Sequence, residues 1–288
     1  MWGAFPLYFA LLDSVSPVEV VAHRVIWSLV FLLGVLALTR GWASVGLVLR
    51  SRRSVLLLGV AAIAITVNWT TYVYAVSTDQ VVESSLGYFI NPLVSVALGV
   101  LILRESLRRT QWSAVGIAAL GVVVISFGSG ATPVIGLVLA FSFGCYGLVK
   151  KIAGVDAIPS LTIETALLFP IAAAVLAVAE VNGNAAFVVD GIGISVLLIL
   201  LGPITAVPLL AYVAGANRLP LSILGIAQYS TPTILFILGI TVFAEPVTAT
   251  EWMGFGLIWL ALAVFSIDMV RHSRRPSVLD TLEVAEPT

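Results

Sequence analysis

Residues 193–216 read GISVLLILLGPITAVPLLAYVAGA and contain no charged side chain. This run exceeds the roughly 20 apolar residues that an α-helix needs to cross a bilayer. It is typical of the whole chain, in which 60% of the 288 residues are apolar and only 10% are charged. Soluble domains carry about 25% charged residues, and a soluble chain this apolar could not cover itself with polar surface. The sequence therefore predicts an all-α membrane protein.

Similar apolar runs follow one another along the chain and predict about ten transmembrane helices joined by short loops. The predicted spans cover residues 1–12, 18–39, 54–76, 81–103, 110–128, 132–152, 158–179, 193–216, 221–243 and 250–270. The first range is too short to cross comfortably, so we expect this span to begin upstream of Met1 or to be incomplete. Residues 271–288 are basic and then acidic, and we expect them to form a disordered cytoplasmic tail.

The positions of the lysines and arginines support the count of ten. Threading the spans alternately through the membrane puts all of the 14 cations except Arg24 on the same side. Cationic loops stay in the cytoplasm, so we expect both termini to be cytoplasmic. One missed or invented span in the middle of the chain would scramble this separation.

A shift of 140 residues aligns two stretches of the chain without a gap, which indicates an internal duplication. It superposes Tyr72 on Tyr212, Pro92 on Pro232, Glu105 on Glu245 and Trp112 on Trp252. We therefore predict a first five-helix repeat over residues 1–130 and a second over residues 131–270. Because five is odd, the second repeat is inverted, as in secondary transporters whose binding site lies near the midplane. The alternative is a duplicated structural bundle that transports nothing.

Ionisable side chains inside the predicted spans are candidates for function, because each costs at least ~2.5–3.5 kcal/mol at a helix centre. His23 and Arg24 lie in the span 18–39, and Trp27 continues the face of His23. We predict that they bind substrate or couple a proton; structural pairing at the outer mouth is the alternative. Glu19 is closer to the edge, where we expect a structural role. Glu164 could balance Arg24, titrate during transport, or serve only as a first-turn acid.

Polar and aromatic residues form stripes at helical spacing in both predicted repeats. Asn68 and Tyr72 share a face of the span 54–76, and Tyr88 and Asn91 share a face of the span 81–103. The 140-residue shift places Gln228 opposite Tyr88. We predict that these stripes line a central binding cavity, with members Asn68, Tyr72, Tyr88, Asn91, Gln228 and Tyr229. The alternative is hydrogen bonding between packed helices.

Two prolines at corresponding positions of the repeats, Pro92 and Pro232, each predict a kink in the middle of a span. Such kinks point to the binding region and to bending during gating.

Motifs of energised transport and of catalysis are missing from the sequence. It contains no Gly-rich phosphate loop, no His-Glu-x-x-His motif and no Gly-x-Ser-x-Gly nucleophile elbow. Cys145 is the single cysteine, so a multi-cysteine metal site is impossible. We therefore expect neither an enzyme nor an ATP-driven pump, and no cofactor or metal ion.

Three stretches carry a resemblance to a known family. They are residues 16–28 (SPVEVVAHRVIWS), 82–93 (VESSLGYFINPL) and 218–233 (RLPLSILGIAQYSTPT). Together they resemble the RarD branch, called chloramphenicol-sensitive permeases, of the EamA family in the drug/metabolite transporter superfamily. The resemblance implies ten helices in two inverted repeats, a bacterial plasma (inner) membrane, cytoplasmic termini and the role of a solute exporter or permease.

The expected function is therefore that of a secondary transporter, gradient-driven or facilitative, for a small metabolite or drug-like solute. Its expected partners are that solute, a coupling proton and the surrounding lipids, while a homodimer is left open. The net charge of −1 gives no electrostatic case for binding nucleic acid. The alternative function is a lipid-handling or structural membrane protein without a solute cycle.

Overall fold

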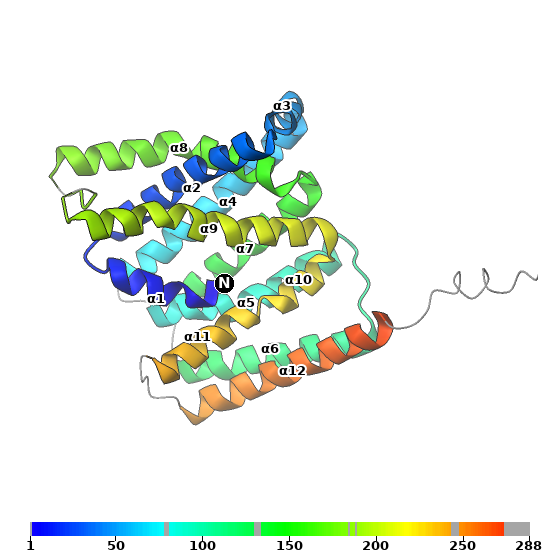
Figure 1. The fold of residues 1–288 in the computed structure, drawn as a ribbon. Coiled ribbons are helices and arrows are strands. Elements are labelled where there is room, and N and C mark those ends of the chain that lie inside the picture. Colours follow the sequence, from blue (N-terminus) through cyan, green and yellow to red (C-terminus); the bar gives the residue numbers. More distant parts are fainter. Residues whose placement is uncertain are drawn as a thin grey trace, which may run out of the picture. The chain divides into compact units, whose positions relative to one another are not determined.

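The computed structural model describes residues 2–77, 81–129, 134–183, 185–187, 189–242 and 248–273. Within these ranges every regular element is a helix, as the sequence predicts (Figure 1). The chain divides into two compact units, one formed by residues 1–105 and 129–246 and the other by residues 106–128 and 247–288. The predicted tail lies outside the described residues from residue 274 onward.

The first unit contains most of the helices, which are labelled in Figure 1. In chain order they are η1 (Trp2–Ala4), α1 (Phe5–Phe9), η2 (Ala10–Leu12), α2 (Pro17–Thr39), α3 (Trp42–Arg50), α4 (Arg52–Ser77), α5 (Val81–Leu101), α7 (Val134–Ala153), α8 (Ala157–Val181), α9 (Ile192–Arg218), α10 (Leu221–Ala227) and α11 (Ser230–Thr241). The second unit holds α6 (Arg109–Ser129) and α12 (Ala249–Ser273).

In the described part of the chain, 8 helical segments are long and apolar enough to cross a membrane, and each overlaps a predicted span. The predicted span 81–103 corresponds to α5, whose apolar portion Gly87–Leu101 is shorter. The predicted span 1–12 forms only the short helices η1, α1 and η2. The structure thus confirms a multi-pass helical protein, while the count of ten spans stays a prediction.

Helices from the two predicted repeats pack against one another in the first unit. Helix α2 packs on α8 and α9, and α7 packs on α4 and α5. Glycine allows the closest crossings: a Cβ atom on Gly202 of α9 would lie 2.3 Å from the carbonyl oxygen of Trp27 in α2. A Cβ atom on Gly225 of α10 would lie 2.9 Å from the carbonyl oxygen of Pro92 in α5. These contacts bring the predicted site helices together.

The predicted span 221–243 is two helices rather than one, because the chain turns at Gln228 and Tyr229 between α10 and α11. The Gln228 N–H donates to the carbonyl oxygens of both Leu224 and Gly225, at 3.2 and 3.0 Å. Pro232 consequently lies in the first turn of α11, where a missing N–H breaks no helical hydrogen bond. The predicted mid-helix kink at Pro232 is therefore wrong, whereas Pro92 does lie inside α5.

Glu105 caps a different helix from the one that the sequence suggests. We expect from the sequence that Glu105 and Glu245 cap the helix that follows each of them. Instead Glu105 accepts hydrogen bonds from the backbone N–H groups of Leu221 (2.6 Å) and Ser222 (2.9 Å) at the start of α10. Glu245 lies outside the described residues.

In the second unit, α6 and α12 meet at a pair of glycines. A Cβ atom on Gly121 of α6 would lie 2.9 Å from the carbonyl oxygen of Gly254 in α12. Arg108, just before α6, forms an ion pair of 2.7 Å with Asp268 of α12. These two contacts hold this helix pair together.

Candidate substrate site

Arg24 of α2 is the centre of a group of aromatic and hydroxyl side chains. Only 9% of the residue is exposed. Its guanidinium carbon lies 4.7 Å from the ring centroid of Trp69 in α4 and 5.8 Å from the rings of Phe5 and Phe9 in α1. The Nε–H donates to the hydroxyl oxygen of Thr205 in α9 at 3.1 Å. A planar guanidinium surrounded by rings is a favourable cation–π arrangement.

Two tyrosines predicted from the sequence belong to the same group. The Arg24 guanidinium interacts electrostatically with the hydroxyl groups of Tyr88 in α5 and Tyr72 in α4. The structure therefore brings together Arg24, Tyr72 and Tyr88, which lie far apart in the sequence. We refer to the whole group as the Arg24 site, with members Phe5, Phe9, Arg24, Trp69, Tyr72, Tyr88 and Thr205.

His23 faces away from this site, toward the segment between α8 and α9. Its Nδ1 atom accepts a hydrogen bond from the Trp27 indole N–H at 3.2 Å, and its ring lies 5.2 Å from that of Phe187. The Nε2 atom is 3.6 Å from Oε1 of Glu19, which also accepts from the backbone N–H of Ala186 at 2.9 Å. Glu19 thus has the structural contact expected of it, and His23 with Trp27 forms a separate group.

The two predicted asparagines make contacts between and within helices. Asn68 of α4 donates to the carbonyl oxygen of Leu139 (2.9 Å) and the hydroxyl of Ser142 (3.1 Å), both in α7. Asn91 accepts from the Ser95 hydroxyl one turn along α5 at 3.3 Å. These contacts match the alternative of hydrogen bonding within a packed bundle, and they place neither asparagine against Arg24.

Gln228 and Tyr229 occupy the break between α10 and α11. Gln228 contributes to a cavity of about 170 Å³, which is also lined by Trp2, Tyr212 and Thr231. Tyr229 is buried, and among the described residues neither its hydroxyl nor the Gln228 side-chain nitrogen has a hydrogen-bond partner. Unsatisfied polar groups beside a discontinuous helix are typical of transporter binding regions.

Glu164 of α8 forms a buried ion pair with Lys150 of α7. The two residues are 2% and 1% exposed, and the Lys150 ammonium also donates to the hydroxyl of Ser160. That ammonium lies 5.3 Å from the Tyr146 ring centroid. Two expectations need correction: Glu164 balances Lys150 rather than Arg24, and Lys150 is buried between helices instead of lying in a loop.

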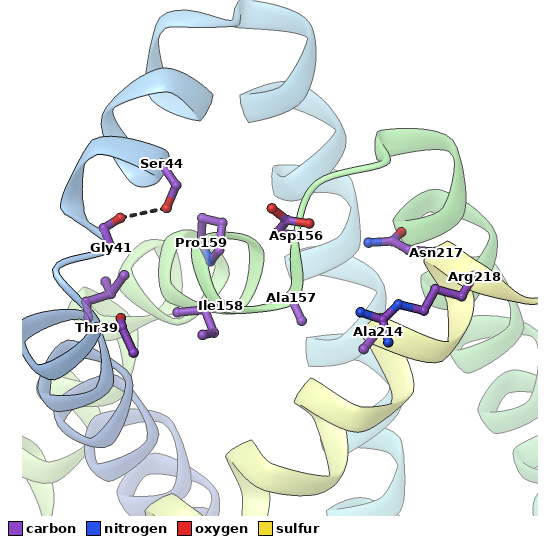
Figure 2. Close-up of a pocket in the computed structure, with 11 residues that line it drawn as sticks. Thr39, Gly41, Ser44, Asp156, Ala157, Ile158, Pro159, Ala214, Asn217 and Arg218 are labelled. Carbon is purple, nitrogen blue, oxygen red and sulfur yellow. Dashed lines mark hydrogen bonds between the residues drawn. The ribbon is translucent and has the colours of Figure 1, made fainter.

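A second cavity, of about 320 Å³, lies at the helix ends for which the sequence predicts the cytoplasm. Figure 2 shows Asp156, Asn217 and Arg218 on one side of it and Thr39 and Ser44 on the other. Thr39 is fifteen residues beyond Arg24 on α2, so this cavity is about 20 Å along the helix from the Arg24 site. None of the predicted site residues lines it.

Sequence reasoning missed several members of the observed groups. Trp69 lies three residues before Tyr72 on the same helix, so the spacing could have indicated it. Thr205 and Lys150 carry no comparable signal, because their partners lie on other helices. Among the described residues, no group of three or more His, Cys, Asp or Glu side chains could hold a metal ion.

Comparison with known proteins gives consistent results along the whole chain. The model of the EamA-like transporter family matches residues 1–127. Protein RarD of Streptomyces exfoliatus is 45% identical over 100% of this chain and 91% of that protein. The uncharacterized transporter YojE of Bacillus subtilis is 44% identical, over 95% of this chain and 92% of YojE. Protein RarD of Escherichia coli K12 is 40% identical, over 96% and 94% respectively.

A solved crystal structure shares the fold, with a TM-score of 0.71 over 95% of each chain and a sequence identity of 17%. The apolar helices and the relatives define a multi-pass membrane transporter. Within that class, the chain belongs to the RarD branch of the EamA-like transporter family.

Proposed function

We propose that this protein is a secondary transporter that moves a small metabolite or drug-like solute by alternating access. Two inverted repeats, residues 1–130 and 131–270, would rock around a site near the midplane of the plasma (inner) membrane. Both termini would be cytoplasmic, and transport would be gradient-driven or facilitative. In this arrangement the cavity around Asp156 and Arg218 is the cytoplasmic vestibule (Figure 2).

The observation that carries this proposal is a contact pattern that recurs in both repeats. In the first, Phe5 and Phe9 contact Arg24 on the next long helix. In the second, Lys150 contacts Glu164 on the next long helix, and Tyr146, one turn before Lys150, interacts with the same carboxylate. Tyr146 and Lys150 each follow Phe5 and Phe9 by 141 residues, and Glu164 follows Arg24 by 140.

The helical positions of the two charges agree with an inverted relation. Arg24 is seven residues after Pro17, the first residue of α2, and Glu164 is seven residues after Ala157, the first residue of α8. Each charge is therefore about 10 Å from the start of its helix. In inverted repeats those starts lie on opposite sides of the membrane, so a solute would pass one charged group from each side.

The first test is a ligand screen by thermal shift on the purified protein in detergent, followed by uptake of each hit into proteoliposomes. Binding to the folded state stabilises by mass action, so a hit identifies the chemical class of the solute. We expect a hit that accumulates inside proteoliposomes faster than in protein-free vesicles, with or without dependence on an imposed pH gradient. A protein that binds and moves only phospholipid would instead support the lipid-handling alternative.

A further inference from the structure

The charge of Arg24 differs from every other buried cation–carboxylate arrangement in the described residues. Lys150, the other cation buried between helices, is neutralised by Glu164. No side chain that the structure describes forms an ion pair with Arg24, whose close neighbours are rings and hydroxyl groups. Leaving a buried charge uncompensated is strongly unfavourable. The site is therefore electrostatically incomplete as it stands.

The hydrogen bonding of the guanidinium is incomplete as well. The group offers five N–H donors in a fixed planar fork. Its Nε–H is bound to Thr205, and among the described residues its two terminal Nη groups have no acceptor. Thr205 fixes the orientation of the plane through Nε and leaves the Nη groups free. A carboxylate accepts two parallel bonds from such a fork, and charge-assisted pairs of this kind are the strong ones.

The neighbours of Arg24 also indicate what the rest of the ligand is like. The rings of Phe5, Phe9 and Trp69 surround the guanidinium and offer apolar faces. Tyr72 and Tyr88 add hydroxyl groups that can donate to an anion. A positively charged group on the ligand would meet an unpaired cation here, so the site disfavours cationic solutes.

We propose that the Arg24 site binds the carboxylate of a small organic monoanion whose remaining part is apolar or aromatic. One anionic charge neutralises the one unpaired cation, and the carboxylate takes the free Nη donors. This inference specifies the substrate class of the transporter and rests on the proposed function for its biological meaning. It also assigns positioning roles to Thr205, Trp69, Phe5 and Phe9.

Isosteric acids and amides test this proposal on the full-length protein in detergent. The probes are 3-phenylpropionate, indole-3-acetate and hexanoate, each compared with its own amide by isothermal titration calorimetry. We expect at least one acid to bind and its amide to bind roughly tenfold to a hundredfold more weakly, which is the ratio for losing one or two hydrogen bonds to a charged group. The proposal is overturned if no acid binds more tightly than its amide.

Three variants assign the effect to the site. Arg24→Gln removes the charge and should abolish the preference for the acid, whereas Arg24→Lys keeps the charge without the fork and should retain part of it. Thr205→Val leaves Arg24 present but removes the acceptor of its Nε–H, and should weaken acid binding severalfold. Arg50→Gln is the matched control, because Arg50 is an exposed arginine at the end of α3. Unchanged acid binding in Arg24→Gln would overturn the proposal.

Uptake into proteoliposomes distinguishes failure of this inference from failure of the proposed function. If a neutral or cationic solute is transported at the same rate by the wild-type protein and Arg24→Gln, the substrate class is wrong and the transporter function stands. If an acid binds at Arg24 and is not moved across the membrane, the site stands and the transporter function is wrong.

Discussion

At the scale of single residues, the two buried cations of the first unit are stabilised in different ways. Lys150 has a carboxylate from the neighbouring helix, while Arg24 has aromatic faces and one hydroxyl acceptor. A buried ion pair on adjacent helices is a structural element, and its removal should affect folding. An arginine with free donors is available to a ligand, and its removal should affect binding.

The Lys150–Glu164 pair gives a prediction about stability. Glu164→Gln leaves the Lys150 ammonium buried without a counter-charge, and breaking a buried pair in this way costs about 3–5 kcal/mol. We expect a clearly lower midpoint of thermal unfolding in detergent for this variant. The double variant Lys150→Met/Glu164→Gln removes both charges and should recover most of the loss. Asp190→Asn, at an exposed position, is the control, and equal midpoints for Glu164→Gln and wild type would contradict the structural role.

At the scale of helices, the crossing of α2 and α9 depends on the absence of a side chain at Gly202. Gly202→Ala puts a methyl group against the backbone of Trp27, which cannot move aside as a side chain could. We expect destabilisation of at least about 1–3 kcal/mol, the usual cost of overpacking. Gly193→Ala is the matched control in the same helix, because its added Cβ would meet nothing within 4 Å. Similar unfolding midpoints for the two variants would rule out a tight crossing.

Pro92 lies inside α5 beside Gly225 of α10, and its effect should be on movement rather than affinity. Pro92→Ala supplies an N–H that can complete a helical hydrogen bond and stiffen α5. We expect a lower turnover rate in proteoliposomes with little change in the dissociation constant of the ligand. Turnover equal to that of the wild type would remove the gating role from this proline.

The sequence predicted the long helices well because each is a local property of an apolar run. It missed the break at Gln228 and Tyr229, which interrupts a run that is apolar on both sides. It also missed α3, a helix without buried residues in what looks like a loop. The capping of α10 by Glu105 was out of reach, because these groups are more than 100 residues apart and meet only after the helices pack.

The candidate site was predicted in part for the same reason. Arg24 was identified from its charge alone, and Tyr72 and Tyr88 from helical spacing, and the structure brings these three together. Asn68 satisfied the same spacing rule and instead bonds to α7, since spacing gives a face of a helix but not the partner of that face. Lys150 was assigned to a loop because its position near the end of α7 looks the same in sequence whether the side chain is solvated or buried.

At the scale of the whole molecule, the predicted topology can be checked by labelling from each side of the membrane. Cysteines at Arg50 and Asp190, introduced separately into a Cys145→Ser background, occupy exposed positions. The charge distribution predicts that Arg50→Cys reacts with a membrane-impermeant maleimide only from the cytoplasmic side, and Asp190→Cys only from the outer side. Reaction of both positions from the same side would contradict the threading and the inverted repeats.

The proposed cycle links the residue scale to the molecule. A solute whose carboxylate binds Arg24 would neutralise the unpaired charge, and the paired Lys150 and Glu164 lie at the corresponding position of the second predicted repeat. His23 lies beside Glu19, and its predicted coupling of a proton would act at the entrance of the site. His23→Ala should therefore abolish transport while insertion into the membrane stays intact, and full activity of this variant would exclude that role.

The most direct test of the account is uptake of an acid identified by the binding screen into proteoliposomes that contain wild-type protein, Arg24→Gln or Arg50→Gln at matched density. We expect accumulation with wild-type protein and Arg50→Gln, and only the rate of protein-free vesicles with Arg24→Gln. Equal accumulation by the wild-type protein and Arg24→Gln would show that transport does not depend on the Arg24 site and would contradict the central claim.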